Sequence, residues 1–229
     1  MKKVLKYKSA REESPDSITT LNKVLPTWYK KTLPWKNNKI QLVPKSTQTF
    51  KKCVPFLDSM LLGYAITLPA DILIDQNAPE LISWGCAFEV AGARLDNNNE
   101  LLPVPEGFLP IEFVWRDPGS FKVPKGYSAI ITHPFNRYEL PFLTLTGVID
   151  GEFVMAAGGN LPFWLRKDYN GIIPKGTPIA QVIPFKRESW QLEEDESVVK
   201  EGYLNMMKTN ASILTGWYKN EIWQKKTYE

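Results

Sequence analysis

Prolines interrupt most of this chain at short intervals. The 229 residues include 18 prolines, and a proline inside a helix removes one backbone hydrogen bond and clashes with the preceding turn. Between residues 40 and 190, prolines and glycines separate short runs rich in β-branched and aromatic residues, such as 64–75, 111–119 and 123–134. Runs of this kind are typical of strands. The pattern predicts a mainly β domain, organised as a sandwich or a barrel-like fold of short strands.

The two ends of the chain differ in composition from this middle part. Residues 1–24 are polar and charged, and 25–39 hold two proline–aromatic clusters separated by lysines, which favours an extended conformation. No proline follows residue 190, and apolar residues recur there near helical spacing, with acidic residues before them and lysines after them. We therefore predict an extended arm over 1–39, a β domain over 40–190 and a C-terminal helical segment over 191–229.

Large aromatic and apolar side chains in the two predicted appendages are candidates for subunit contacts, because such residues anchor protein interfaces. The candidates are Trp28, Tyr29 and Trp35 in the arm, and Tyr203, Met206, Trp217 and Trp223 in the C-terminal segment. Two alternatives follow. If these side chains are exposed in the monomer they mark an assembly surface, and if they fold back on the β domain the argument for assembly weakens.

Charge and composition narrow the possible partners. The formal charge is +3, and terminal lysines are typical of a solvated surface, so we expect neither a nucleic-acid nor a membrane partner. One histidine and two cysteines without a CxxC pair do not make a metal site. We expect no metal and no cofactor. A signal-peptide-like core and a membrane-length apolar run are both absent, which indicates synthesis in the cytosol.

Four polar residues are the candidates for chemistry. Asp150 stands in "TGVIDGEF" (146–153), where Asp-Gly is typical of a tight hairpin; it is either a turn residue or a catalytic base, and the pattern favours the turn. His133 is the sole histidine, and no nucleophile-elbow motif accompanies it. Arg137 could bind a carboxylate or a phosphate, or form a local salt bridge. Lys175 lies in one of two Pro-Lys-Gly turns.

Two of these segments resemble a known superfamily. "TGVIDGEF" followed by "GIIPKGTPIAQVIPF" (171–185) is similar to the dUTPase and dCTP-deaminase superfamily, which has a β-clip fold. The matching residues are Gly147, Ile149, Asp150, Lys175, Gly176, Ile179, Ala180 and Gln181. The resemblance implies that Asp150 activates a water, with phosphates held by a Ser-rich loop, Mg²⁺ and a Gly-rich C-terminal arm. This chain departs from that pattern, because "HPFNRYELPF" (133–142) stands at the Ser-rich position and its C-terminus reads as helical.

A second resemblance covers more of the chain, from about residue 25 to 190. "LPTWYKK", "CVPFLDSMLLGY" and "VPKGYSAIITHPFNR" look like segments of uncharacterised proteins of tailed bacteriophages, cyanophage-like ones especially. It implies a phage protein made in the host cytoplasm, with the virion as its destination. The favoured hypothesis is a non-enzymatic structural or assembly protein whose partners are other phage structural proteins or copies of itself. The alternative is a dUTPase-like nucleotide-binding or nucleotide-hydrolysing enzyme that uses a cleft near Asp150 and Lys175. Asp150 is then the catalytic candidate, and His133, Arg137 and Lys175 are the ligand-binding candidates.

Overall fold

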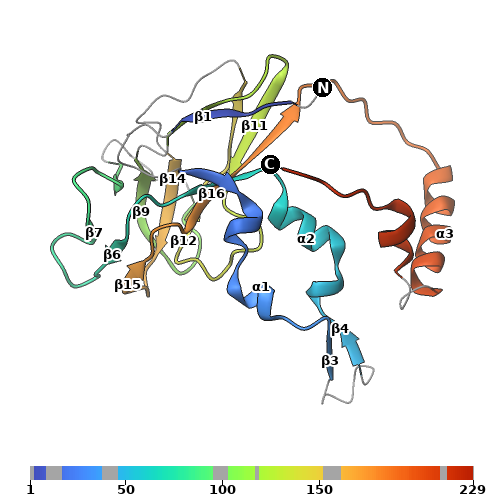
Figure 1. Cartoon of the computed structure of the whole chain (residues 1–229), viewed down its shortest axis with the longest axis horizontal. Coiled ribbons are helices and arrows are strands. Elements are labelled where there is room, and N and C mark those ends of the chain that lie inside the picture. The colour runs from blue at the N-terminus through green and yellow to red at the C-terminus, as the bar shows by residue number, and fades with distance from the viewer. Residues whose placement is uncertain are drawn as a thin grey trace. The chain divides into compact units, whose positions relative to one another are not determined.

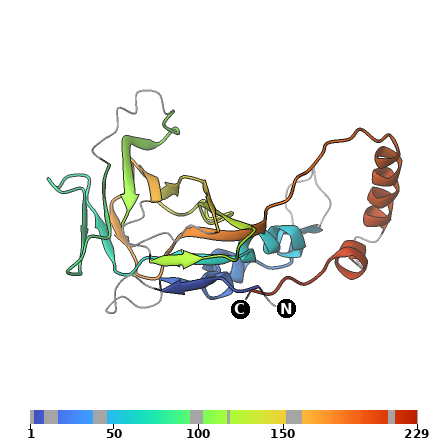
Figure 2. The same cartoon turned by 90° about the horizontal axis from the view of Figure 1, so that it is seen from above.

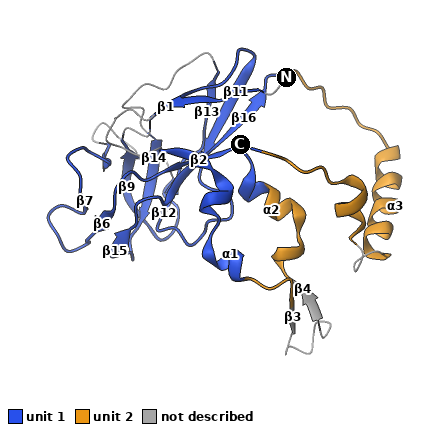
Figure 3. Ribbon diagram, in the orientation of Figure 1, with its two compact units in different colours: residues 1–31, 59–187, 228 blue, residues 32–58, 188–227, 229 orange. Residues whose placement is uncertain are grey.

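The chain is seen in a computed structural model that describes residues 3–8, 17–37, 46–94, 103–116, 119–151, 161–211 and 216–228. It is mainly β, with several antiparallel sheets and a C-terminal helix, which confirms the predicted fold class. The residues group into two compact units (Figure 3). Unit 1 comprises residues 1–31, 59–187 and 228, and unit 2 comprises 32–58, 188–227 and 229.

The larger sheet of unit 1 has five antiparallel strands in the order β13-β11-β16-β5-β2. These strands are β13 (Gly147–Asp150), β11 (Tyr127–Thr132), β16 (Pro178–Lys186), β5 (Tyr64–Thr67) and β2 (Ile18–Thr20). β16 is the longest and lies at the centre of the sheet (Figure 1). Its first six residues are all buried. Strands covered on both faces are near-continuous apolar runs, and the sequence of β16 is of this kind.

A four-stranded antiparallel sheet packs on this one. Its strands follow the order β12 (Phe142–Thr144), β14 (Leu161–Arg166), β9 (Phe108–Trp115) and β8 (Ala91–Ala93). Two smaller sheets complete unit 1. One contains β15 (Gly171–Ile173), β6 (Ile72–Ile74) and β7 (Ile82–Trp84), and the other pairs β1 (Lys6–Lys8) with β10 (Ser120–Lys122).

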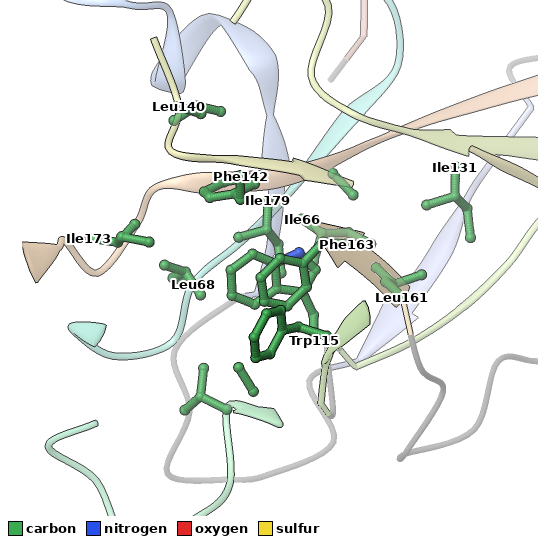
Figure 4. Packing of buried hydrophobic residues seen from close by; sticks show 14 of the residues in the cluster. Ile66, Leu68, Trp115, Ile131, Leu140, Phe142, Leu161, Phe163, Ile173 and Ile179 are labelled. Atoms are coloured by element: carbon green, nitrogen blue, oxygen red, sulfur yellow. The ribbon is translucent and has the colours of Figure 1, made fainter. Parts of the chain in front are cut away.

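The hydrophobic core lies between the two larger sheets and centres on three aromatic rings (Figure 4). Trp115 stacks on Phe163 with ring centroids 3.7 Å apart, and Phe142 meets Trp115 edge-on at 5.0 Å. The indole Nε1 of Trp115 donates to the Thr144 hydroxyl (3.2 Å), which in turn donates to the Ile179 carbonyl (2.5 Å). This buried hydroxyl therefore satisfies the one polar group of Trp115 and links the two sheets.

The predicted extended arm over 1–39 is in part integral to unit 1. β2 forms an edge of the five-stranded sheet, and Ile18 and Leu21 are buried in the core region. η1 (Leu21–Val24) and the short helix α1 (Thr27–Lys31) follow. The extended conformation predicted for 25–39 is thus wrong over α1. The prolines flank this helix rather than interrupt it, and the Pro26 carbonyl accepts a hydrogen bond from the Lys30 amide (3.1 Å), as a residue before a first helical turn can.

Unit 2 contains a small hairpin and the C-terminal helices. β3 (Trp35–Asn37) pairs with β4 (Ser46–Gln48), and η2 (Phe50–Lys52) leads into α2 (Val54–Leu61), which continues into unit 1. α3 (Ser197–Ala211) is a continuous helix in both views (Figures 1 and 2), and η4 (Tyr218–Ile222) follows Gly216. The second strand predicted after Asp150 falls on 152–160, outside the described residues.

Gly63, at the turn from α2 into β5, gives a stringent test of this packing. Its φ is +82°, and a Cβ there would lie 2.0 Å from the Val182 carbonyl oxygen. Because the obstacle is backbone of the central strand, Gly63→Ala should lower the free energy of unfolding by about 3 kcal/mol or more, from backbone strain plus displacement of β16. Urea unfolding measures this loss.

Gly126 is the matched control for Gly63. It has the same φ of +82°, but nothing lies within 4 Å of a Cβ placed there. Gly126→Ala should therefore cost only the left-handed strain, about 1–2 kcal/mol. Equal losses in the two variants would contradict the predicted contact between Gly63 and β16.

Candidate functional site

Asp150 lies at the end of β13, opposite Ser128 of β11. The Ser128 hydroxyl donates to its carboxylate (2.9 Å), and Arg187 Nη1 lies 3.5 Å from the same oxygen. Asp150 is exposed, with 66% of its side chain accessible. The next residue, Gly151, donates its amide to the Tyr127 carbonyl (2.8 Å) and extends the pairing of β13 with β11. The observed contacts of Asp150 are those of a cross-strand residue at the end of β13.

His133 immediately follows the other end of β11 and is held in one neutral form. Its Nε2 lies 3.2 Å from the Arg137 carbonyl, and the Thr144 amide donates to Nδ1 (3.4 Å). A carbonyl can only accept, so the proton is on Nε2 and Nδ1 is the acceptor. Burial lowers the pKa of His133 below its usual 6.5 and outweighs the hydrogen bond to the Arg137 carbonyl, which raises it; the charge of the Arg137 guanidinium lowers it further.

The Arg137 guanidinium connects two segments of unit 1. Its Nη1 donates to the Val24 carbonyl at the end of η1 (3.0 Å), and its Nε donates to Glu139. Its guanidinium therefore contacts a backbone oxygen and a carboxylate of its own chain. The local salt bridge, which was one of the alternatives for Arg137 from the sequence, is present with Glu139.

Lys175 lies in the turn between β15 and β16. Its backbone amide donates to Asp71 Oδ1 (2.6 Å), and the next amide, of Gly176, donates to the Leu68 carbonyl (2.9 Å). These contacts fix the turn backbone, while the Lys175 side chain is exposed. This segment therefore connects the sheet that contains β15 with the sheet that contains β16.

The four candidates do not form one constellation. His133 and Arg137 are neighbours, but Asp150 pairs with Ser128, five residues before His133 along β11. At ~3.3 Å per strand residue this places them about 16 Å apart. A general base must lie within hydrogen-bond distance of the group whose proton it takes, or reach that group through one water. Asp150 therefore does not act with His133 or Arg137 in this arrangement.

Gln181 is a buried polar residue of unit 1 that several hydrogen bonds hold in place. The sequence pointed to it only as part of the dUTPase-like motif. Its side chain is fully buried at the centre of β16. Its Nε2 donates to the Ser59 carbonyl (2.9 Å) and the Leu62 carbonyl (2.6 Å), and its Oε1 accepts from the Phe135 amide (3.0 Å). A lone polar residue within the apolar run of β16 was the signal that could have pointed to it.

A small apolar hollow lies beside Gln181. Its walls include Leu21, Val24, Leu25 and Met60, with Arg137 among the polar lining residues. Its enclosed volume is about 10 Å³, room for about one water molecule, whereas small-molecule sites usually enclose ~300–1,000 Å³. The hollow is therefore too small for a nucleotide.

The C-terminal helix α3 presents apolar residues to solvent. Val199, Tyr203 and Met206 follow the i, i+4, i+7 spacing of one helix face, and no residue of α3 is buried. Tyr203 is 63% exposed and Met206 51%. Asp195 accepts from the Ser197 amide (2.8 Å) and caps the helix, and the Ser197 hydrogen bonds lower the pKa of Asp195.

The other predicted interface residues have mixed environments. Trp28 and Trp35 are partly exposed, and the Lys52 ammonium lies over the Trp35 ring. Trp217 and Trp223 are half-buried, and Trp223 Nε1 donates to Asp58 (2.7 Å) within unit 2. Tyr29 is buried within unit 1 at 3% exposure. For Tyr29 the second alternative applies, because its ring is folded back into unit 1, and this weakens the argument for it as an interface anchor.

No cluster of three or more His, Cys, Asp or Glu residues that could hold a metal ion occurs among the described residues. In the same part of the chain, no helix has the length and apolar character needed to cross a membrane.

Comparisons with known proteins give a distant structural likeness only. No family model matches the chain, and no curated protein matches it. A dUTPase of phage phi11 of S. aureus superposes with a TM-score of 0.37 and 11% identity, covering 84% of this chain and 97% of that one. A dUTPase of Staphylococcus bacteriophage 80alpha gives 0.35 and 13%, covering 84% and 88%. Neither match assigns this chain to a family or gives it an activity.

The neutral form of His133 predicts a pH dependence of stability. Above pH ~6.5 the imidazole is neutral in both folded and unfolded chains, so its contribution is complete. As the pH falls below 6.5 the unfolded chain takes up the proton first, and stability declines until the lowered folded pKa is passed. Each unit of depression corresponds to ~1.4 kcal/mol. His133→Gln should remove this decline.

Urea unfolding of both proteins between pH 5 and 7.5 checks this expectation, and His133 is the sole histidine of the chain. Identical pH slopes in the wild type and the variant would show that burial of the imidazole does not govern its titration.

The contacts of Gln181 predict a large cost for an apolar replacement of similar size. Gln181→Leu would leave two buried carbonyls and one amide without their partner, at about 1 kcal/mol or more each, so the loss should be about 3 kcal/mol. Gln224→Leu, at an exposed glutamine of unit 2, is the matched control and should change stability by less than ~0.5 kcal/mol. Thermal and urea unfolding measure both, and a neutral Gln181→Leu would contradict the assignment.

Proposed function

We propose that this chain is a non-enzymatic structural or assembly protein that contacts other subunits through its C-terminal helical segment. The observation that supports this most is α3, a helix of 15 residues with an apolar stripe and no buried residue. Isolated helices of about this length are marginal in water, and most helices in proteins are stabilised by packing of one face. A partner that covers Val199, Tyr203 and Met206 supplies that packing.

The polar candidates support the same proposal. Asp150 is paired with Ser128 and Arg187, Arg137 with Glu139 and the chain backbone. These groups are distributed along β11 rather than gathered on one reacting atom, and catalysis needs such preorganised neighbours. The resemblance to tailed-phage proteins makes other phage structural proteins, or copies of this chain, the partners proposed here, and the virion the destination.

The α3 stripe can be tested with a pair of matched variants. Met206 and Leu204 are both 51% exposed, but Leu204 lies about 160° away from Met206 around the helix. Met206→Glu should weaken assembly by roughly tenfold or more, because it places a charge in a desolvated contact. Leu204→Glu should assemble like the wild type. Sedimentation velocity on the full chain, and incorporation into particles, measure both.

A mass-spectrometric inventory of purified particles decides the wider proposal. A structural protein is present at fixed stoichiometry, and an assembly factor is present in immature particles. Absence from both, together with a monomeric chain at every concentration, would overturn it. The enzymatic alternative is checked by pyrophosphate release from deoxynucleoside triphosphates with Mg²⁺. Turnover that Asp150→Asn abolishes would replace the assembly proposal with nucleotide hydrolysis.

A further inference from the structure

We propose that the ribbon formed by β1 and β10, together with the turn that follows β10, binds the phosphate backbone of a nucleic acid. This surface, here called the basic ribbon, carries Lys3, Lys6, Lys8, Lys122 and Lys125. All five residues belong to unit 1. The inference therefore depends neither on the C-terminal helical segment nor on the proposed assembly.

Strand pairing brings these lysines together from two segments that are far apart in the sequence. β1 pairs with β10 in a register that places Lys6 directly opposite Lys122. Lys8, opposite Ser120, is a diagonal neighbour of Lys122, at about 7–8 Å in a ribbon of this kind. Side chains alternate between the two faces of a strand, so these three lysines share one face, and all three are exposed.

The positive surface continues beyond the two strands. β1 lies next to β11 (Figure 1), and the Lys3 ammonium is 5.5 Å from the centroid of the Tyr127 ring at the start of β11. Lys125 is exposed in the turn between β10 and β11. Arg187, which follows β16, lies beside the same turn, since its amide donates to the Gly126 carbonyl (2.9 Å).

Positive charge is concentrated in the basic ribbon. The described segments 3–8 and 119–128 contain five lysines and no acidic residue. Their charge exceeds the +3 of the whole chain, so the rest of the chain is net negative. Asp150, at the end of β13, lies 3.5 Å from Arg187 and is paired with it. The overall charge gave no reason to expect a nucleic acid because it averages over this separation.

The register itself favours an anionic ligand. Like charges directly opposite each other on an antiparallel ribbon are destabilising, and Lys6 and Lys122 are placed in this way. A phosphate group held between the two ammoniums replaces their repulsion with two charge-assisted hydrogen bonds. The pair is therefore better suited to a bound anion than to water alone.

The composition of this face distinguishes a phosphate backbone from other anionic partners. The residues that share it are Lys6, Lys8, Lys122 and the half-buried Ser120, with no large apolar side chain among them. Protein interfaces centre on apolar and aromatic anchors and are depleted in lysine, and interfacial membrane binding buries an apolar face in addition to its charges. Phosphate contacts need only cationic side chains and hydroxyls.

The number of lysines sets the expected salt dependence. Each neutralised phosphate contributes about −0.7 to the slope of log K against log salt on a single strand, and about −0.9 on a duplex. Five lysines then give slopes of about −3.5 and −4.5. Raising the salt from 50 to 200 mM should therefore weaken binding about 100-fold on a single strand and about 500-fold on a duplex.

Fluorescence anisotropy tests this with labelled mixed-sequence DNA of about 20 nucleotides, single-stranded in one arm and duplex in the other. Lys6→Gln with Lys122→Gln should weaken binding roughly tenfold or more at 50 mM salt and reduce the slope by about 1.4 or 1.8, respectively. Lys167→Gln with Lys175→Gln is the matched control and should keep the slope, because both lysines are exposed in unit 1 outside the basic ribbon. The full chain carries Met206→Glu throughout, so that contacts of the α3 stripe do not contribute.

Losses of affinity and slope that are confined to the ribbon variant support the inference, whichever form of DNA binds more tightly. The inference is overturned if the parent chain binds neither DNA at 50 mM salt, or if the ribbon variant and the control weaken equally. Binding to phosphatidylserine vesicles without binding to DNA also overturns it. Urea unfolding checks that each variant is folded. If the first variant does not fold, Lys8→Gln with Lys125→Gln replaces it at two exposed positions.

Discussion

The arrangement of unit 1 depends on the buried carboxamide of Gln181. Three chain segments that are far apart in sequence meet there, because the α2 end supplies two carbonyls and the 133–137 turn supplies an amide. The carboxamide itself is fully buried, and these three bonds satisfy it in a low-dielectric interior where an unpaired polar group is costly. One side chain therefore fixes how α2 ends, where the turn after β11 lies and, through both, the walls of the hollow.

Other buried polar side chains of unit 1 are also satisfied by hydrogen bonds or ion pairs within the chain. Thr144 joins the two large sheets through Trp115 and Ile179, and the buried carboxylate of Glu112 pairs with Arg94 (3.0 Å). Polar groups satisfied in this way hold the strands in place but are occupied by their own chain. The subunit contact proposed above uses other side chains, the exposed apolar residues of α3 such as Tyr203 and Met206.

Sequence patterns predicted what depends on local chemistry. Proline and glycine spacing predicted short strands, and the proline-free end with its acidic start predicted the C-terminal helix. The structure adds that Asp195 caps this helix. These patterns did not predict the features that depend on tertiary contacts. β2 and Tyr29 belong to unit 1 because sheet pairing and core packing override a polar, proline-flanked context. The partners of Asp150 and Gln181 come from residues 22 to 122 positions away, which no local pattern contains.

In the proposed function, α3 links folding to assembly. The Asp195 cap and the preceding acidic residues favour the first turn, but capping and propensity alone sustain a 15-residue helix only weakly. Its apolar stripe adds stability only when another surface covers it. The free energy that completes the helix then comes from the subunit contact itself, and the contact in turn requires the helix, because Val199, Tyr203 and Met206 share one face only in that conformation. In the proposed assembly, helix and interface therefore form together, so that the subunit contact is cooperative with local folding.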